Sequence, residues 1–325
     1  MAKKSYGNLI KPLSAGTTFQ GKAEHGQVPF TTVPGVGEQS ISLSGRKHLE
    51  GLDLSFIWAM HNGFGPWHGG RGMHVHPYPE VHFYVGVDTA AINYLGSEVE
   101  IRLGEEQEAH TFSEPTVVVI PAGLPHGPTE TKRIYSPRGF GFYLAALSGS
   151  FKTDWLDKPA KSGAGGKYDH LVKPLKSAIV VERGQMKSPR EGTPAGGNSP
   201  MKLGPGNADH LAWMHGKDLE GLNANMDWGF FSSPGLWHQG VGAHVHTADE
   251  VLVFVGTDPA RMNYLGAEIE IDLGKEHERF LINKPSVVVC PAGTAHGPFV
   301  THWVDRPFAF FSINLSATPE MTFID

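Results

Sequence analysis

Residues 74–80 read HVHPYPE, and further along the chain residues 121–126 read PAGLPH. Two histidines at alternating positions of a strand point to the same face, so the imidazoles of His74 and His76 can converge on one ion. The two prolines that follow cannot lie in a central strand, so we expect a turn that returns Glu80 beside both histidines. A further histidine ends the second stretch. The pattern predicts a small β structure built around a metal site.

The same pattern occurs a second time, as HVHTADE at 244–250 and PAGTAH at 291–296. A shift of 170 positions, from Leu49 to Leu219, aligns the chain with itself without a gap up to about Pro128. The sequence therefore contains two copies of one domain. We expect an N-terminal domain over residues 1–149, a polar, Gly- and Lys-rich linker over 150–167, and a C-terminal domain over 168–325.

The composition favours short strands over helices. The chain has 325 residues, of which 41 are Gly and 24 are Pro, and both residue types favour turns. No segment has sustained helical periodicity. Short apolar or alternating runs bounded by turn residues predict the following strands in the two copies: 81–85, 98–103, 116–120, 140–144, 251–255, 268–273, 286–290 and 308–313. The expected fold class is all-β, with one antiparallel barrel or jelly roll per copy.

Charge and hydropathy exclude several classes of partner. The formal net charge of −6 gives no basic surface for nucleic acid or an anionic membrane. No run of about 18 apolar residues is present to span a membrane, and no export signal follows the N-terminal lysines. The single cysteine, Cys290, follows an apolar run and is expected to be a reduced core residue. These features predict a cytoplasmic protein.

The pattern H-x-H-x3-E followed by P-x-G-x2-H resembles the two signature motifs of the cupin superfamily. That resemblance implies two tandem jelly-roll β-barrels, a bicupin, in which each barrel binds one metal ion through four side chains. Carried over residue by residue, the implied ligands are His74, His76, Glu80 and His126 in one site and His244, His246, Glu250 and His296 in the other.

The ligand set indicates which metals to expect. Neutral imidazoles with one carboxylate suit Mn(II) first and Fe(II) next, with Zn, Ni and Co as alternatives by affinity. Such a set also leaves coordination positions open for water or substrate.

The two copies differ beside the ligands. His82 and Tyr84 have the same strand parity as Glu80, so all three face the same way. Bicupins that decarboxylate oxalate carry an arginine three positions before the first histidine of the motif, and Arg71 matches it. We predict that Arg71, His82 and Tyr84 hold and protonate a substrate; the alternative is that Arg71 pairs with a surface carboxylate and His82 only packs. The second copy has Val241, Leu252 and Phe254 at these positions.

The predicted function is a metal-dependent enzyme that cleaves a C–C bond of a small, oxygen-rich molecule. The preferred reaction is hydrolysis of a cyclic diketone by metal-bound water, because the chain resembles manganese-dependent cyclohydrolases that open dihydrophloroglucinol-type rings. An O2-dependent dioxygenase and a decarboxylase are alternatives within the superfamily, and a non-catalytic metabolite-binding cupin is the alternative from another class. The expected partners are a small-molecule substrate and further copies of the chain in a homo-oligomer.

Overall fold

A computed structural model describes residues 5–13, 39–67, 72–156, 166–175, 179–182, 206, 208–237, 242–318 and 320–324. The chain divides into two compact units. One unit comprises Ala15–Ser177 and is called the N-terminal barrel below. The other combines Met1–Ser14 with Ala178–Asp325 and is called the C-terminal barrel.

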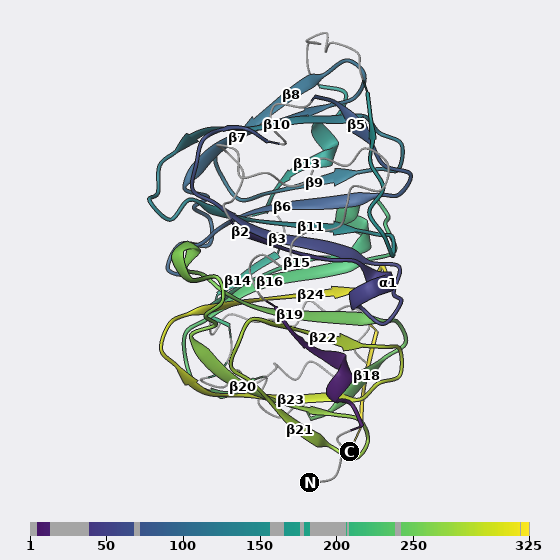
Figure 1. The fold of residues 1–325 in the computed structure, drawn as a ribbon, viewed down its shortest axis with the longest axis vertical. Coiled ribbons are helices and arrows are strands. Elements are labelled where there is room, and N and C mark those ends of the chain that lie inside the picture. Colours follow the sequence, from purple (N-terminus) through teal and green to yellow (C-terminus); the bar gives the residue numbers. More distant parts are fainter. Residues whose placement is uncertain are drawn as a thin grey trace. The chain divides into compact units, whose positions relative to one another are not determined.

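The N-terminal barrel consists of two antiparallel sheets (Figure 1). The first has the order β13-β9-β6-β11-β3-β2. Its strands are β2 (Gln39–Leu43), β3 (Ser55–His61), β6 (Glu80–Gly86), β9 (Thr116–Ile120), β11 (Phe140–Ala146) and β13 (Val172–Pro174). The second has the order β12-β5-β10-β7-β8, and β4 pairs with β10. Its strands are β4 (Gly65–Pro66), β5 (His74–Val75), β7 (Ser97–Leu103), β8 (Glu108–Phe112), β10 (His126–Ile134) and β12 (Asp154–Trp155).

The C-terminal barrel repeats this plan with the orders β1-β22-β19-β24-β16-β15-β14 and β21-β20-β23-β18-β25, and β17 pairs with β23. The strands of its first sheet are β1 (Ile10–Pro12), β14 (Ile179–Glu182), β15 (His210–Met214), β16 (Asn225–Phe231), β19 (Glu250–Gly256), β22 (Ser286–Cys290) and β24 (Phe308–Asn314). Those of its second sheet are β17 (Gly235–Leu236), β18 (His244–His246), β20 (Ala267–Leu273), β21 (Glu278–Ile282), β23 (His296–Val304) and β25 (Met321–Phe323).

Helical segments among the described residues are short: α1 (Gly45–His48), η1 (Gly7–Leu9), η3 (Asp169–Leu171), η5 (Gly216–Leu219) and η6 (Pro259–Arg261). None of these helices is long and apolar enough to cross a membrane. The all-β prediction is confirmed, and each strand expected from the sequence is present with its ends shifted by at most two residues.

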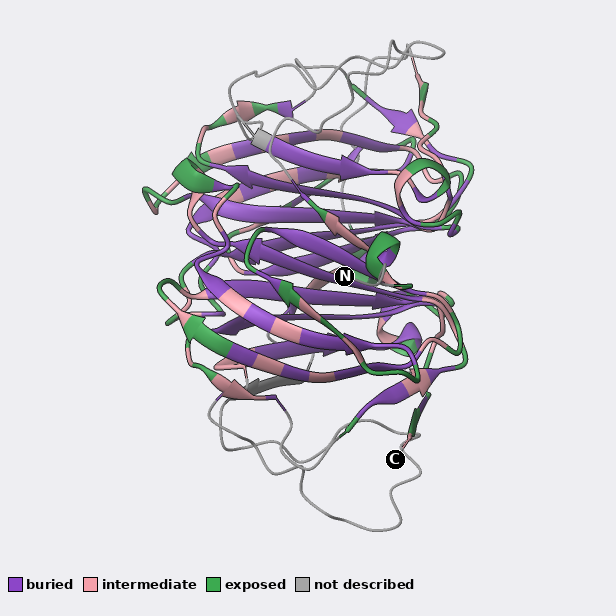
Figure 2. Cartoon of the chain, turned by 60° about the horizontal axis from the view of Figure 1, so that its bottom comes forward, coloured by how far each residue is buried: buried purple, intermediate pink, exposed green. Residues whose placement is uncertain are grey.

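Each barrel has its own core, because alternate residues of its facing strands point inward. Glu80, His82 and Tyr84 share one face of β6, and β6 is buried along its whole length. In the N-terminal core, Trp67 donates a hydrogen bond from Nε1 to Thr131 Oγ1 at 2.9 Å. Cys290 is buried and free in the C-terminal core. Figure 2 shows that the central strands are buried along most of their length, whereas loops carry most of the exposed residues.

Two segments that are repeated in the sequence, 166–174 and 5–12, bind to the barrels through the same kind of hydrogen bonds. The backbone N–H groups of Gly166, Lys167 and Tyr168 donate to the Glu108 carboxylate at 2.8 to 3.2 Å. The Tyr168 ring covers Gly104, where an added Cβ would lie 2.3 Å from it. The matching segment, Ser5–Pro12, is bound likewise by Glu278 of the C-terminal barrel, and its strand β1 pairs with β22.

The observed division therefore differs from the expected boundaries at both segments. Residues 5–13 belong to the C-terminal barrel, and 166–175 belong to the N-terminal one. Part of the expected linker is also structured, since Asp154 and Trp155 form β12 against His74 and Val75. The physical reason is that each barrel completes its first sheet with a strand from the segment that precedes the other copy, β13 in one case and β1 in the other. Residues 157–165 of the linker lie outside the described residues.

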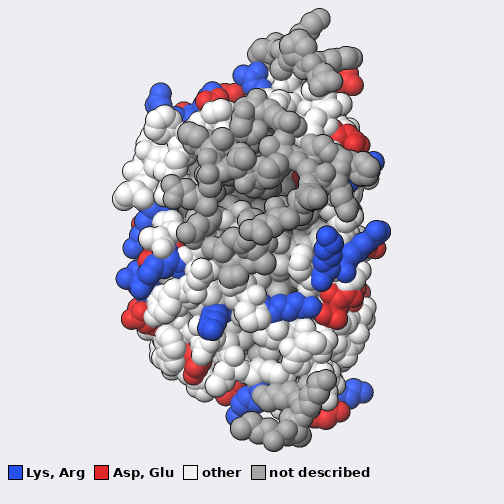
Figure 3. All heavy atoms as spheres, in the orientation of Figure 1, with Lys and Arg blue, Asp and Glu red and all other residues white. Residues whose placement is uncertain are grey.

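Charged side chains on the surface are mixed in sign. On the face drawn in Figure 3, Lys and Arg side chains of the described residues lie among Asp and Glu side chains. This distribution matches the small negative net charge of −6.

Candidate metal centres

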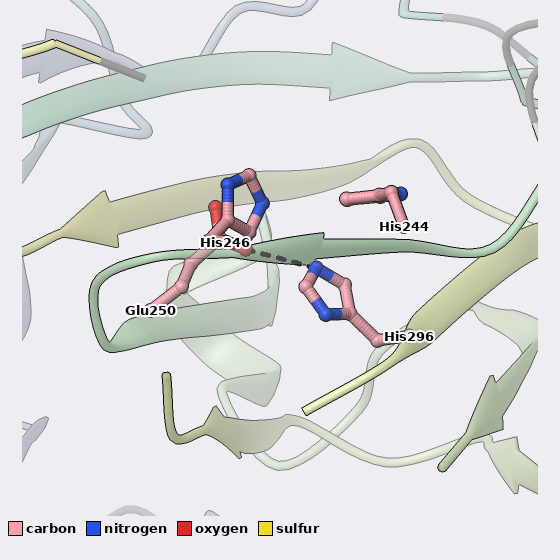
Figure 4. A group of neighbouring side chains, drawn as sticks. All are labelled: His244, His246, Glu250 and His296. Atoms are coloured by element: carbon pink, nitrogen blue, oxygen red, sulfur yellow. Dashed lines mark ion pairs between the residues drawn. The ribbon is translucent and has the colours of Figure 1, made fainter. Parts of the chain in front are cut away.

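The four predicted ligands of the C-terminal barrel converge. Their ligand atoms all lie within 4.8 Å of one another, and all four residues are buried. His244 and His246 come from β18, Glu250 begins β19 and His296 begins β23 (Figure 4). The Nε2 atoms of His246 and His296 lie 3.1 and 3.0 Å from Glu250 Oε2.

The glycine of the second motif joins the two motifs. Gly293 has a φ of 77°, which favours glycine, and its N–H donates to the carbonyl of His246 at 2.9 Å. Gly123 does the same for His76 at 2.8 Å in the N-terminal barrel. The turn that precedes the last histidine is therefore bonded to the strand that carries the others.

Backbone carbonyls orient the imidazoles. The Nδ1 atoms of His246 and His296 lie 2.7 and 3.1 Å from the carbonyl oxygens of Glu320 and Thr294. In the N-terminal barrel, the Nδ1 atoms of His76 and His126 lie 2.6 and 3.0 Å from carbonyls. Those two carbonyls belong to Lys152 and Leu124. Because a carbonyl only accepts, each Nδ1 carries the proton and each Nε2 lone pair faces the cluster.

The C-terminal cluster fits a divalent metal. Oε2 of Glu250 and Nε2 of His296 are buried and make no hydrogen bond of good geometry with a described residue, although they lie only 3.0 Å apart. Burial raises the pKa of Glu250, but the adjacent imidazoles of His246 and His296 outweigh it and hold that pKa well below its usual range. An ionised carboxylate with neutral imidazoles is the donor set that such a metal needs.

The N-terminal cluster has the corresponding three histidines and one glutamate, and a further histidine, His82, lies beside them. The ligand atoms of His74, His76 and His126 form one close group, while Glu80 groups with His82 and His126. Glu80 Oε2 lies 3.0 Å from His82 Nε2, but 3.5 and 3.9 Å from Nε2 of His76 and His126. The prediction that these ligands come together is therefore supported, with Glu80 drawn toward His82.

Burial and charge set the protonation of this cluster in opposite directions. Burial raises the pKa of Glu80, but the hydrogen bond from His82 and the imidazoles of His76 and His126 outweigh it and lower that pKa. Burial lowers the pKa of His126 to about 3, despite the opposing effect of Glu80. A neutral His126 and an ionised Glu80 are both ready to bind a cation.

Two of the three predicted catalytic residues, His82 and Tyr84, face the barrel interior. His82 contacts Glu80, as described above. Tyr84 is fully buried among Trp67, Phe112 and Phe142. Its hydroxyl makes no hydrogen bond of good geometry with a described residue. Arg71 lies outside the described residues, so its role stays a prediction.

Sequence reasoning missed Thr129 as a residue of this interior. Thr129 is buried on β10, three residues after His126. Burial raises the pKa of Tyr84, and a side-chain interaction with Thr129 lowers it by a smaller amount. The matching position in the second copy is Phe299, which is also buried. The shift of 170 positions would have revealed this polar-to-aromatic difference.

The interiors of the two barrels therefore differ in polarity beside the metal ligands. The N-terminal barrel contains His82, Tyr84 and Thr129, and it also contains His61, whose ring stacks on Trp67 at 4.2 Å. The corresponding side chains of the C-terminal barrel are apolar: Leu252, Phe254, Phe299 and Phe231. Beside its four candidate ligands the N-terminal barrel is thus the more polar of the two and the C-terminal barrel the more aromatic.

Sequence comparisons give no relative for this chain. No protein-family model matches it, and no curated protein matches its sequence.

Solved structures do match its fold. A structure of oxalate decarboxylase from Bacillus subtilis, from a study of its Mn(II) centres, gives a TM-score of 0.55 at 12% identity and covers 90% of this chain and 76% of that chain. A deletion mutant of that enzyme gives 0.55 at 14%, covering 97% and 79%. The same enzyme at pH 4.6 gives 0.53 at 14%, covering 90% and 75%. At these identities the likeness shows the fold, which is that of two tandem cupin domains.

Proposed function

We propose that this chain is a Mn(II)-dependent bicupin enzyme that decarboxylates a small, oxygen-rich carboxylic acid in its N-terminal barrel. The observation that carries the proposal is the polar interior beside the metal ligands of that barrel. His82, Tyr84 and Thr129 are buried there, whereas the C-terminal barrel has hydrocarbon side chains at all three positions. Placing polar groups in a buried interior costs free energy, and a bound ligand that hydrogen-bonds to them would offset that cost.

The comparisons favour decarboxylation over hydrolysis of a diketone, which was the first choice from the sequence. The similar structures reported above are oxalate decarboxylases with Mn(II) centres, not cyclohydrolases. Hydrolysis of a diketone therefore has no support from them, and the decarboxylase alternative agrees with them better. A metal bound by His74, His76, Glu80 and His126 would polarise the carboxylate oxygens of the substrate and stabilise negative charge on them.

The residues of the chain would hold the acid and supply the proton. When the bond to the departing carboxylate breaks, CO2 leaves and the electron pair stays on the remaining carbon, which then needs one proton. Hydrogen oxalate, for example, gives CO2 and formate with no net oxidation. His82 is the proposed donor, because its Nε2 lies 3.0 Å from Oε2 of the candidate ligand Glu80 and an imidazole can act as a general acid.

The other two predicted residues would bind the substrate. Burial keeps the Tyr84 hydroxyl protonated, because it raises the pKa of that group. That hydroxyl can therefore donate a hydrogen bond to a substrate oxygen. Arg71 would pair with the second carboxylate of a dicarboxylic acid, as the sequence resemblance implies.

The test is product analysis with Mn(II)-loaded protein. Oxalate, 2-oxo acids and 1,3-diketones labelled with 13C would be followed by NMR, while O2 uptake is recorded. We expect CO2 and the shortened acid without stoichiometric O2 consumption. The His76→Ala variant should lose this activity, and His246→Ala should retain more of it.

Three other outcomes would contradict the proposal. Diketone cleavage without CO2 would identify a hydrolase, and one O2 consumed per turnover would identify a dioxygenase. A ligand that raises the melting temperature only with metal present, with no product, would identify a binding protein.

A further inference from the structure

We infer that His82 makes the N-terminal centre the weaker of the two metal sites, and that Leu252 at the matching position leaves the C-terminal centre the tighter one. The inference rests on the metal-binding part of the proposed function and not on the reaction. It concerns divalent first-row ions such as Mn(II), for which each cluster supplies three histidines and one glutamate.

The first observation is the oxygen atom that His82 contacts. His82 Nε2 lies 3.0 Å from Oε2 of Glu80. This is the same oxygen that approaches Nε2 of His76 and His126, at 3.5 and 3.9 Å. The imidazole of His82 therefore binds the carboxylate oxygen that faces the other ligands.

The second observation is the arrangement in the other copy. Oε2 of Glu250 lies 3.1 and 3.0 Å from Nε2 of His246 and His296, which are themselves predicted ligands. The residue at the position of His82 is Leu252, which is buried and has no donor. All four ligands of this site form one close group, whereas those of the N-terminal site are split between two.

These contacts distinguish a competitor from an orienting residue. A residue that orients a metal-binding carboxylate holds the oxygen that does not coordinate and thereby strengthens the site. His82 holds the coordinating oxygen, so an ion entering the N-terminal site must displace that contact or share the oxygen. A hydrogen bond to a charged group is strong enough to reduce metal affinity about 10- to 100-fold.

The arrangement gives the two centres different behaviour. The C-terminal centre fills first and keeps its ion, beside an interior filled by aromatic rings. The N-terminal centre fills second and releases its ion first to a chelator, beside the polar interior that would receive substrate. His82 thus lowers the metal affinity of this centre, in addition to being the proposed proton donor.

The experiment is a titration of metal-free protein with Mn(II) in competition with a fluorescent chelator. For the wild type we expect two sites whose dissociation constants differ by about 10-fold or more. His82→Leu should tighten the weaker site until the two agree within about 3-fold. The reciprocal variant, Leu252→His, should weaken the tighter site by about 10-fold. His76→Ala and His246→Ala identify which site is which.

A matched control separates this effect from a general loss of polarity. His61→Phe also replaces a buried histidine of the same barrel by the residue of the second copy, but His61 stacks on Trp67 and Phe140. It should leave both dissociation constants unchanged. His82→Gln keeps a donor and should leave the weaker site closer to the wild type than His82→Leu does.

Two results would overturn the inference. Equal affinities of the two wild-type sites would do so, and so would a weaker N-terminal site in His82→Leu, which would make His82 itself a ligand. If His82→Leu does not fold, Leu252→His decides: an unchanged tight site refutes the inference. Binding at neither wild-type site would remove the metal from the proposed function as well, whereas two unequal sites without turnover would refute only the reaction.

Discussion

Replacing Tyr84 by Phe is expected to stabilise the protein while lowering its activity. The Tyr84 side chain is 0% exposed, and its hydroxyl makes no hydrogen bond of good geometry with a described residue. A buried hydroxyl in that state costs about 1–3 kcal/mol of folding free energy. Phe254 occupies the matching position in the second copy and is equally buried, so the Phe ring fits this barrel plan.

The size of the expected stabilisation follows because the Tyr84→Phe substitution removes the cost of the buried hydroxyl without creating a cavity. We expect Tyr84→Phe to gain about 1 kcal/mol, which corresponds to a rise in melting temperature of about 2–4 °C for a domain of this size. Turnover should fall by about 10-fold or more, because the lost hydroxyl would bind a substrate oxygen. Stability at a functional site and activity would thus move in opposite directions.

The assay is thermal unfolding of the metal-free protein together with turnover of the Mn(II)-loaded form. Tyr143→Phe is the matched control, because Tyr143 is also buried. It lies on the other face of the sheet from Tyr84, where its ring stacks on Phe83 at 4.0 Å. The control should keep wild-type turnover. A Tyr84→Phe variant that is as active as the wild type, or less stable by more than about 1 kcal/mol, would refute the reasoning.

Three further outcomes are expected. Mn(II) at about 100 times its dissociation constant should stabilise each barrel by about 2.7 kcal/mol, and Glu250→Ala should abolish this gain in one unfolding transition only. Calorimetry in which Mn(II) shifts neither transition of the wild type would contradict the metal sites. Gly104→Ala should destabilise by about 1–3 kcal/mol in urea unfolding, because Gly104 has a φ of 75° and an added Cβ would meet Tyr168 at 2.3 Å, whereas Gly51→Ala, with nothing within 4 Å, should cost less. Burial raises the pKa of Glu108, but three hydrogen bonds from backbone N–H groups outweigh it and lower that pKa below 4.5. The ionised Glu108 therefore stabilises the folded protein above pH 4.5, and this stabilisation is lost as the pH falls through the pKa of Glu108 in the folded state. Glu108→Gln should therefore lower the melting temperature at pH 7 but much less near pH 3, and equal effects at both would show that its charge is irrelevant.

The fold and the grouping of the candidate ligands could be expected from the sequence because both depend on local patterns. Strand alternation places His244 and His246 on one face, and the fixed spacing to Glu250 and His296 recurs in both copies. A repeated spacing of three histidines and one glutamate is hard to obtain from packing alone. The close grouping of the four side chains in the C-terminal barrel agrees with that reasoning.

The domain boundaries could not be predicted in the same way. The repeat relates Tyr6 to Tyr168, but it does not say which sheet either segment joins. That choice depends on contacts far apart in the chain, between Glu278 and the N–H groups of Ser5 and Tyr6. Strand β2 was missed because its residues, Gln39–Leu43, have only two apolar side chains.

The contact between Glu80 and His82 was also beyond the sequence pattern. Parity shows that the two side chains share a face, but the side-chain rotamers decide which imidazole the carboxylate approaches. Thr129 was missed because it follows the second motif, and its role emerges only when it is compared with Phe299 across the repeat. Packing between strands distant in sequence is what the pattern omits.

The most direct test of the central claim, one metal per barrel through the predicted ligands, is the metal content per chain. Protein saturated with Mn(II) and freed of excess ion would be analysed by inductively coupled plasma mass spectrometry, as wild type and as His76→Ala and His246→Ala. Two equivalents in the wild type and one in each variant are predicted. Wild-type protein without bound Mn(II), or variants that keep both equivalents, would contradict the account.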